Sequence, residues 1–300
     1  MKIELIDVWF RYDTLANDWA LKDINLKLSE GEKVVIVGPA GSGKTTLIQL
    51  LDALILPTKG DILFDGISVG ALSKKKKLST IRRRTGLLFQ FPEHQFFQES
   101  AYEEICFGVK NFFDLDNDKI ESMVKDLLAS FGMDIDMIKR VSPFNLSSGE
   151  KRKLALASVI IMSPEFLILD EPTAGLDAPG RHELIKIISS LKDTSVIVVT
   201  HNLDDFLGIA DRVIGLSKGC KVLDVQKEET INFLQTMEDN DIMPPLVIQI
   251  QRWLLDKGIH LDQSYWEMED LVTRLKQELG IYPNGDSGIT ELVSFKDKKH

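Results

Sequence analysis

The segment at residues 38–45 reads GPAGSGKT and constrains the fold more than any other part of the chain. It follows the apolar run KVVIV at residues 33–37 and leads into TLIQLL at residues 46–51. The spacing G-x-x-x-x-G-K-[ST] is typical of a phosphate-binding loop, in which glycines let backbone N–H groups turn inward and the next helix points its positive end at the phosphate. A strand, this loop and a helix in succession predict an α/β fold around a nucleotide site. The alternative is an ordinary glycine-rich turn.

The residue types of this phosphate loop predict individual roles. Lys44 would reach the β- and γ-phosphates, and the Thr45 hydroxyl would hold Mg²⁺. The residues expected to bind the phosphates are Gly38, Pro39, Ala40, Gly41, Ser42, Gly43, Lys44, Thr45 and Thr46.

Length and composition limit the classes to which the chain can belong. Its 300 residues, 44% of them hydrophobic, favour two domains over one. No apolar run approaches the roughly 18 to 20 residues that span a bilayer, so work at a membrane would need another subunit to supply the span. The net charge of -10 argues against broad electrostatic binding of nucleic acid. Cys106 and Cys220 lack metal-ligand spacing and fit a reducing, cytoplasmic compartment.

The first strands also offer a candidate for base recognition. Residues 2–9 and 24–28 alternate apolar and polar side chains, as half-buried strands do. Tyr12 follows directly after Trp9 and Phe10, and an exposed aromatic ring at this strand end could stack on a purine base. The alternative is that all three rings pack in the protein.

Two acidic residues follow a buried strand. Residues 166–169 read FLIL and end at Asp170 and Glu171, and open α/β sheets bind ligands at this end of their strands. Asp170 would complete the Mg²⁺ shell, and Glu171 would act as the general base that polarises the attacking water. The alternative is a pair of solvated carboxylates.

Two more polar residues follow strand-like runs. Gln90 comes after residues 86–89, where it would contact Mg²⁺ or a water, and the aromatic segment 91–97 could grip another protein. His201 follows the apolar run 195–200 and would hydrogen-bond a γ-phosphate, although a lone histidine is more often a capping or surface residue.

Residues 100–162 have helical periodicity, and the segment 146–150 reads LSSGE before a helix expected at 151–162. Such a helix start is either a second anion site or ordinary capping.

Further helices are expected near 180–192 and from Asp204, and strands near 212–216 and 221–225. The basic runs 74–77 and 82–84 are expected to be a solvated face, with contact to anionic lipid or an acidic partner as the alternative.

Taken in order, these motifs resemble those of the ATP-binding cassette family of nucleotide-binding subunits, over residues 1 to about 225. The resemblance implies a P-loop core with a mixed sheet and flanking helices, an antiparallel N-terminal β-subdomain and a helical subdomain at about 95–162. It implies that Tyr12 stacks on adenine, that Gln90 couples the site to a transmembrane partner, that Asp177 lies at a dimer interface and that His201 is a switch histidine.

The family's usual signature is LSGGQ, and here the signature segment is Leu146, Ser147, Ser148, Gly149 and Glu150. Ser147, which would touch the γ-phosphate, and Gly149, which allows close backbone approach, are kept. Ser148 and Glu150 depart from the pattern, and Glu150 places a negative charge near a polyphosphate.

Within the family, the segment 89–97 is similar to the ATPases of energy-coupling-factor importers for vitamins and metal ions. Those subunits carry a short helical C-terminal extension that helps them to dimerise, and here residues 226–300 are expected to form it. A helix after Pro245 would place Leu246, Val247, Ile250, Trp253 and Leu254 on one face.

A second helix in this extension would begin with a capping box of Ser264 and Glu267. Its inward residues are expected to be Met268, Leu271, Val272, Leu275 and Leu279. Residues 281–300 are expected to be frayed.

The resemblance implies an ATPase that uses ATP and Mg²⁺, pairs with itself or a related ATPase, and binds a transmembrane coupling subunit and a substrate-binding membrane subunit. It would be peripheral at the cytoplasmic face of the cell membrane. The main alternative is a soluble cassette ATPase of DNA repair or translation. A P-loop kinase would not account for residues 146–150 or Asp177. A pure interaction module would not need the predicted catalytic residues Gln90, Glu171 and His201.

Overall fold

The computed structural model describes residues 1–13, 18–261 and 263–278. The chain divides into two compact units, Met1–Pro244 and a second that begins at Pro245. The division lies after Pro244 rather than after residue 225, because residues 227–239 form helical turns that pack on the last two strands of the first unit.

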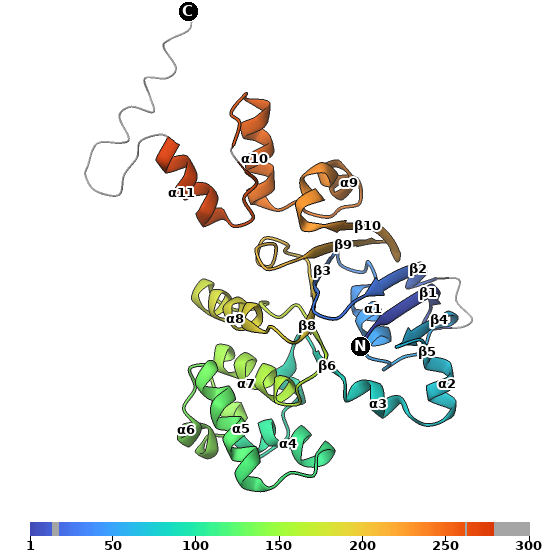
Figure 1. The fold of residues 1–300 in the computed structure, drawn as a ribbon, viewed down its shortest axis with the longest axis vertical. Helices are drawn as coiled ribbons and strands as arrows, with labels where there is room; N and C mark the ends of the chain where they lie inside the picture. The colour runs from blue at the N-terminus through green and yellow to red at the C-terminus, as the bar shows by residue number, and fades with distance from the viewer. Residues whose placement is uncertain (14–17, 262, 279–300) are drawn as a thin grey trace, which may run out of the picture. The chain divides into compact units, whose positions relative to one another are not determined.

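A six-stranded sheet carries the phosphate loop and the two acidic residues (Figure 1). Its strands, in spatial order, are β10 (Cys220–Gln226), β9 (Arg212–Ser217), β3 (Lys33–Val37), β8 (Ser195–Thr200), β7 (Phe166–Asp170) and β6 (Thr85–Leu88). All neighbouring pairs are parallel except β9 and β10. The carboxyl ends of β3, β6, β7 and β8 therefore meet at one edge of the sheet, the edge at which open α/β sheets bind ligands.

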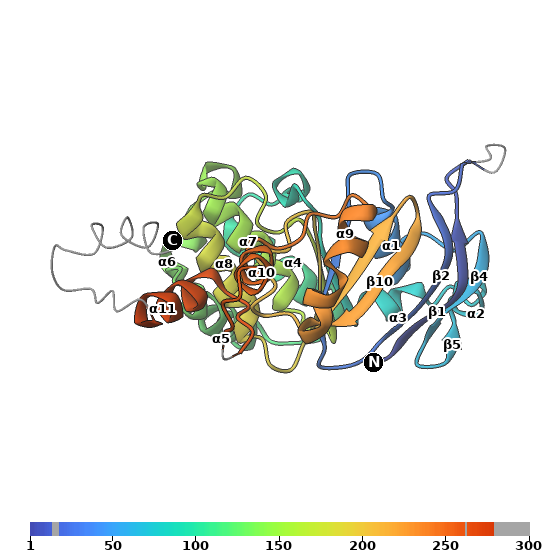
Figure 2. The same ribbon diagram turned by 90° about the horizontal axis from the view of Figure 1, so that it is seen from above.

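A second, four-stranded antiparallel sheet follows the order β2 (Leu21–Leu28), β1 (Ile3–Phe10), β4 (Lys59–Phe64) and β5 (Ile67–Ser68). It confirms the antiparallel N-terminal subdomain. In Figures 1 and 2 this sheet and helices α4–α6 lie at opposite ends of the first unit, with the six-stranded sheet between them.

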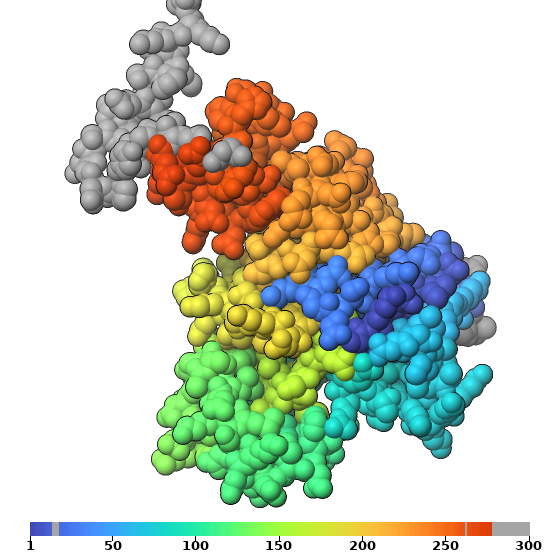
Figure 3. All heavy atoms as spheres, in the orientation of Figure 1, coloured from blue at the N-terminus to red at the C-terminus, as the bar shows by residue number. Residues whose placement is uncertain are grey.

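The helices connect and cover these sheets. In the core they are α1 (Lys44–Leu51), α2 (Val69–Lys74), α3 (Leu78–Arg82), α8 (Ala178–Ser190) and α9 (Leu234–Asp239), with the 3-10 turns η1 (Pro92–Gln95) and η3 (Lys227–Phe233). The helical subdomain holds α4 (Ala101–Phe112), α5 (Asn117–Ser130), α6 (Ile135–Arg140), η2 (Pro143–Asn145) and α7 (Ser148–Ile160). Figure 3 shows this subdomain, in green, in contact with the core.

The main core lies around α1, between the two sheets. Ile36 of β3, Ile48 of α1 and Ile62 of β4 are all fully buried in one apolar cluster. Burying each such side chain contributes about 2 kcal/mol before entropy costs are counted. This packing fixes the start of α1, and hence the phosphate loop, against the sheet.

Two expected helix positions in the first unit are wrong. α7 begins at Ser148, not at 151, because the Ser147 hydroxyl and the Glu150 carboxylate form a reciprocal capping box there. No helix opens at Asp204: the segment forms turns whose N–H bonds alternate between three residues back, as from Ile209 to Phe206, and four residues back, as from Leu207 to Leu203. Asp205 instead accepts a hydrogen bond from Thr173 at 2.9 Å.

The second unit contains α10 (Leu246–Asp256) and α11 (Met268–Glu278). The expected apolar face of α10 is divided: Val247 and Leu254 are buried, whereas Leu246 and Trp253 are exposed. α11 starts at Met268, later than an N-cap at Ser264 would place it. Of its expected inward residues, Leu271 is buried and Val272 is exposed.

Buried Gln251 links α10 to the segment before α11. Its amide nitrogen donates to the Tyr265 carbonyl oxygen at 2.7 Å, and its amide oxygen accepts from the Tyr265 N–H at 2.8 Å. Leu279 and residues 281–300 lie outside the described residues.

Within the described parts of the chain, no helix is both long and apolar enough to cross a bilayer.

Asp52, at the end of α1, makes stability depend on pH. Its carboxylate is buried and accepts a hydrogen bond from Thr85 at the start of β6. Burial raises the pKa of Asp52 to about 6, although Thr85 and Arg82 oppose the shift. A carboxyl whose pKa is raised in the folded state stabilises the fold most below its unfolded pKa, and that contribution is lost as pH rises through about 6.

We therefore expect Asp52→Asn to remove part of the pH dependence of the free energy of unfolding. Relative to the variant, the native protein should lose up to roughly 3 kcal/mol between pH 4 and pH 7. Urea unfolding at pH 4.5, 6 and 7.5, with the exposed Asp126→Asn as control, measures the difference. Parallel pH profiles for native protein and Asp52→Asn would contradict the prediction.

Candidate nucleotide and magnesium site

The phosphate loop has the steric features that a close backbone approach requires. A Cβ on Gly38 would lie 2.2 Å from the Leu216 carbonyl oxygen. Gly43 has a φ of +103°, and a Cβ there would lie 2.7 Å from the Ala20 carbonyl oxygen. Only glycine fits both positions, so Gly38 and Gly43 are needed for the shape of the loop.

The loop also has unused hydrogen-bonding capacity. Among the residues that the structure describes, the buried Ser42 hydroxyl finds no hydrogen-bond partner. The first N–H groups of α1 have no partner within the helix, and no side chain caps its start. An orphaned hydroxyl and free N–H groups at a helix start fit a phosphate group, whose oxygens accept hydrogen bonds.

Lys44 crosses this loop. Its ammonium donates hydrogen bonds to the carbonyl oxygens of Gly38 at 2.6 Å and Pro39 at 2.9 Å. Burial lowers the pKa of the Lys44 ammonium, while Glu171 and Asp170 act in the opposite direction. A charged phosphate would replace two neutral carbonyls as its partners, which favours binding of an anion here.

Thr45 and Asp170 meet as the candidate magnesium ligands. The Thr45 hydroxyl donates to Asp170 Oδ2 at 3.4 Å, across from the end of β7. Burial raises the pKa of Asp170, and the neighbouring Glu171 raises it further. A hydroxyl and a carboxylate are oxygen ligands of the kind that Mg²⁺ prefers, and a cation would relieve the repulsion between the two acids.

Glu171 forms a pair with His201. Its Oε1 lies 2.9 Å from His201 Nδ1, and its Oε2 accepts a hydrogen bond from Thr200 at 3.2 Å. Glu171 is buried and has a φ of +46°, in the left-handed region that non-glycine residues seldom adopt. The Glu171 carboxylate thus contacts the last residue of β8 and the histidine that follows it.

Gln90 lies at the same edge as Asp170, since Leu88 of β6 pairs with Leu169 of β7. The structure brings the backbone of Gln90, rather than its amide, into a hydrogen bond: its carbonyl oxygen accepts from Arg152 Nη1 at 2.6 Å. Its role as a magnesium ligand stays a prediction.

Tyr12 is exposed, and its ring lies edge-on to Phe10 with centroids 4.9 Å apart. The Tyr12 hydroxyl is hydrogen-bonded to Thr46 at 3.0 Å and to Gln49 at 3.3 Å, both on α1. The ring therefore stands beside the start of α1 with surface free to stack on a base, and its contact with adenine stays a prediction.

The signature segment lies apart from the phosphate loop. Ser147, Gly149 and Glu150 line a cavity of about 310 Å³ whose other walls come from α7 and the start of α8 and include no residue of the loop. Asp177 caps α8, since its Oδ1 accepts a hydrogen bond from the Gly180 N–H at 2.9 Å. Within one chain, the structure does not bring residues 146–150 or Asp177 to the nucleotide site.

Known proteins share this architecture and sequence. The family model described as "ABC transporter" matches residues 21–174. The chain belongs to the ATP-binding cassette transporter family. It is 37% identical over 272 residues to the energy-coupling factor transporter ATP-binding protein EcfA2 of Clostridium tetani, covering 90% of this chain and 93% of the relative.

Two solved structures agree with this cassette fold. CbiO1 of Clostridium perfringens, described as part of the ABC transporter complex CbiONQ, has a TM-score of 0.70 and 30% identity, covering 83% of this chain and 98% of that one. A dimeric bacterial ABC transporter cassette, MJ0796, has a TM-score of 0.67 and 26% identity, covering 75% of this chain and 98% of that one. The predicted family, and the energy-coupling-factor group within it, are confirmed.

The sequence analysis missed Arg152. This buried arginine also donates to the Ala174 carbonyl oxygen at 3.0 Å, so it joins α7 to Gln90 and to the segment that follows Glu171. Burial lowers the pKa of its guanidinium. The sequence feature that pointed to Arg152 is its place just after the signature segment, between two lysines and before the apolar run 154–157 of the same helix.

Glu150 folds back onto Ser147 in this cassette. Its Oε2 accepts hydrogen bonds from the Ser147 N–H at 2.9 Å and the Ser147 hydroxyl at 2.6 Å. These bonds lower the pKa of Glu150, so it is an anion at neutral pH. A phosphate that approached Ser147 would compete with this carboxylate for the same donors and be repelled by it.

We expect Glu150→Gln to lower the ATP concentration needed for half-maximal hydrolysis by about three- to tenfold, which corresponds to roughly 1 kcal/mol. Glutamine keeps the capping box but removes the negative charge. Steady-state phosphate release against ATP concentration measures the change. An unaltered or higher half-maximal concentration would mean that Glu150 does not oppose the nucleotide.

Proposed function

We propose that this chain is the ATP-hydrolysing subunit of an energy-coupling-factor importer for a vitamin or a transition-metal ion. The observation that carries the proposal is the joint placement of Thr45, Asp170, Glu171 and His201 at the mouth of the phosphate loop, in a chain that is 37% identical to an energy-coupling factor ATP-binding protein.

In the proposed reaction, the loop binds the ATP phosphates through its N–H groups, and Lys44 turns from its two carbonyl partners to the β- and γ-phosphates. Bound Mg²⁺ would compensate phosphate charge, and Thr45 and Asp170 would hold it, with Gln90 as a further ligand. Glu171 accepts a proton from the water that attacks the γ-phosphorus. His201 orients the Glu171 carboxylate through their 2.9 Å contact.

The nucleotide site is completed by a second cassette. The cavity at the signature segment is separate from the phosphate loop of the same chain, and the similar cassette MJ0796 is described as dimeric. In a head-to-tail dimer, Ser147 and Gly149 of one chain would contact the γ-phosphate held by the other. Binding of ATP closes this dimer and hydrolysis reopens it, because the second helix start compensates phosphate charge only when the dimer is shut.

The second unit suits a role in this pairing. Leu246, Ile250 and Trp253 recur at helical spacing on α10; Leu246 and Trp253 are exposed and Ile250 is half-buried. An apolar stripe of this kind fits the dimerisation role that the sequence resemblance implied for the extension. The partner in the pair is a second copy or a related ATPase.

Exposed aromatic residues after β6 offer a surface for a transmembrane coupling subunit. Phe97 and Phe107 meet edge to face with ring centroids 4.7 Å apart, and both are exposed, as is Phe91. The 3-10 turn η1 connects these rings to Gln90, so contact with a membrane subunit would reach the site through this segment. The chain would then lie at the cytoplasmic face of the membrane through its partners.

Purification from native membranes tests this proposal. In mild detergent, the tagged chain should co-elute with apolar membrane subunits, and Phe107→Ser should reduce their yield by about tenfold, because exposed aromatic anchors dominate interfaces. Phe112→Ser is the matched control, since Phe112 is similarly exposed on the same helix but does not contact Phe97. A wholly soluble chain that carries nucleic acid would overturn the importer and favour a soluble cassette ATPase.

A further inference from the structure

Three segments of the nucleotide site meet at the guanidinium of Arg152. Its Nη1 donates to the Gln90 carbonyl oxygen at 2.6 Å, and its Nη2 donates to the Ala174 carbonyl oxygen at 3.0 Å. Arg152 itself lies in the second turn of α7, whose N-cap is Ser147. One planar group therefore joins the helix of the signature segment, the strand end that carries Gln90 and the turn that follows Glu171.

Arg152 is placed where a cation is costly. It is only 5% exposed, and within the part of the chain that the structure describes it forms no ion pair. Glu93 acts on it only as a nearby charge, without a hydrogen bond. Two neutral carbonyls offset only part of the cost of burying a guanidinium. What the guanidinium provides in return is a rigid fork of donors, which no other side chain can supply to two carbonyls at once.

The Ala174 carbonyl belongs to the tight turn that carries Glu171. The Ala174 N–H donates to the Glu171 carbonyl oxygen at 3.1 Å, and the Glu171 N–H donates to the Val199 carbonyl oxygen of β8 at 2.8 Å. Because Glu171 has a φ of +46°, the turn needs surrounding contacts that hold a strained backbone. The bond from Arg152 supplies one of these contacts from outside the turn.

The bond to Gln90 reaches a segment that is fixed at both ends. At the far end, the buried Glu104 accepts hydrogen bonds at its Oε2 from the Phe97 N–H at 3.1 Å and the Gln98 N–H at 3.0 Å. Both anchors bind backbone groups, so they set the path of residues 90–98. Since Arg152 is the anchor beside Gln90, a movement of α7 shifts the Gln90 backbone directly.

We infer that Arg152 is a positioning residue for hydrolysis, which fixes the turn of Glu171 and the backbone of Gln90 relative to the helix that begins at the signature segment. The inference rests on the proposed ATPase function and deepens it. When Ser147 meets the phosphate of the partner's ATP, α7 carries Arg152 with it, and Arg152 carries the turn of the general base. Closure of the dimer thereby aligns Glu171 through two hydrogen bonds to backbone carbonyls.

Turnover and ATP affinity, measured separately on the full chain, test this inference. Arg152→Gln should lower kcat by about ten- to a hundredfold, because displacing a catalytic group by about 1 Å costs activity on that scale. Affinity for a fluorescent ATP analogue should stay within about twofold, which is less than about 0.5 kcal/mol. Arg152→Lys keeps the buried cation but serves one carbonyl, so it should show the same split with a smaller loss of turnover.

Two results of these measurements would overturn the inference. One is turnover that is unchanged in both variants. The other is affinity for the ATP analogue that falls as far as turnover, because Arg152 would then shape the phosphate site as a whole.

A double-mutant cycle separates positioning of Glu171 from general weakening of the protein. In the Glu171→Gln background, the group that Arg152 positions is already inert. Adding Arg152→Gln should therefore lower the residual turnover by less than about twofold. A purely structural role would lower turnover by the same factor in both backgrounds, and that result would refute the inference.

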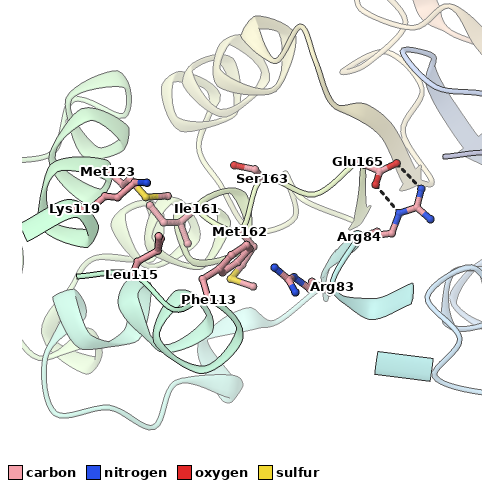
Figure 4. Close-up of a pocket in the computed structure, with 10 residues that line it drawn as sticks. All are labelled: Arg83, Arg84, Phe113, Leu115, Lys119, Met123, Ile161, Met162, Ser163 and Glu165. Atoms are coloured by element: carbon pink, nitrogen blue, oxygen red, sulfur yellow. Dashed lines mark hydrogen bonds and ion pairs between the residues drawn. The ribbon is translucent and has the colours of Figure 1, made fainter. Parts of the chain in front are cut away.

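Arg84→Gln is the matched control for the loss of a bridging arginine. The Arg84 guanidinium donates to Glu165 at 2.5 and 2.8 Å, as the dashed lines in Figure 4 show, and it lies 2.7 Å from Asp65. Arg84 precedes β6, whereas Gln90 follows that strand. The variant should lower the melting temperature by a few degrees. Its kcat should stay within about twofold of the native value, because Arg84 contacts no segment of the nucleotide site.

Hydrogen exchange without nucleotide distinguishes this inference from the proposed function. In Arg152→Gln, the Ala174 amide, which bonds to the Glu171 carbonyl oxygen, should exchange about tenfold faster, whereas in Arg84→Gln it should not. A native chain without ATP turnover would refute the proposed function, and exchange at Ala174 would still test the tie to Arg152. Unchanged exchange at Ala174 in Arg152→Gln would contradict the inference even in an active ATPase.

Discussion

Replacing Glu171 with glutamine should lower the rate of ATP turnover by about two to three orders of magnitude while leaving ATP binding intact. The amide cannot accept a proton from the attacking water. It keeps an oxygen for the hydrogen bond from Thr200, so the buried turn after β7 should keep its shape. Phosphate release measures turnover, and equilibrium binding of a fluorescent ATP analogue measures affinity.

The same variant should accumulate a closed dimer in the presence of ATP and Mg²⁺, because binding closes the pair and stalled hydrolysis does not reopen it. Size-exclusion chromatography with and without ATP detects this. Glu121→Gln is a suitable control, since it removes an exposed carboxylate whose ion pair with Lys139 contributes little to the free energy of unfolding. Undiminished hydrolysis in Glu171→Gln would remove its role as the general base.

Replacing Gly149 with aspartate should abolish ATP-driven dimerisation and lower turnover by about a hundredfold or more, without destabilising the monomer. No heavy atom lies within 4 Å of an added Cβ at Gly149. A carboxylate in the first turn of α7 also interacts favourably with the helix dipole. In the closed dimer, however, the same carboxylate would face the γ-phosphate of the partner's ATP.

Gly70→Asp is a matched control for this substitution. Gly70 occupies the same place in the first turn of α2 that Gly149 occupies in α7, and a Cβ there meets only the Ser68 hydroxyl at 3.5 Å. Both variants should keep the melting temperature within a few degrees, and only Gly149→Asp should lose dimerisation and turnover. A Gly149→Asp chain that still dimerises with ATP would show that the signature segment does not face a nucleotide.

Mixing two inactive variants adds a test of whether the pair is made of identical chains. Lys44→Ala removes the phosphate-binding ammonium, and Gly149→Asp blocks the opposite half-site. A mixed homodimer regains one intact composite site, so part of the turnover should return on mixing. No recovery would favour a pair with a related ATPase.

Much of the nucleotide site was predictable because its residues sit at the ends of short, strongly apolar strands. β3 has the bounds Lys33–Val37 and β7 ends at Asp170, as the sequence indicated. In a parallel sheet such ends meet at one edge, so Thr45 and Asp170 could be placed together from the sequence.

Other features depended on contacts between distant segments. The helix start at 148 rather than 151 follows from a reciprocal pair of hydrogen bonds between Ser147 and Glu150. The role of Arg152 depends on carbonyl groups that are far away in the sequence. On α10, helical periodicity identified the apolar residues, but only packing selected Val247 and Leu254 for burial and left Leu246 and Trp253 exposed.

The sequence by itself determined that this chain holds the phosphates of a nucleotide, because glycine spacing, a lysine and a threonine before a helix specify that chemistry locally. The tertiary structure decided that Lys44 rests on its own loop, that Glu150 occupies the donors of Ser147, and that Arg152 joins α7 to Gln90 and Ala174. These features follow from side-chain packing and charge across elements, which no local pattern of residues encodes.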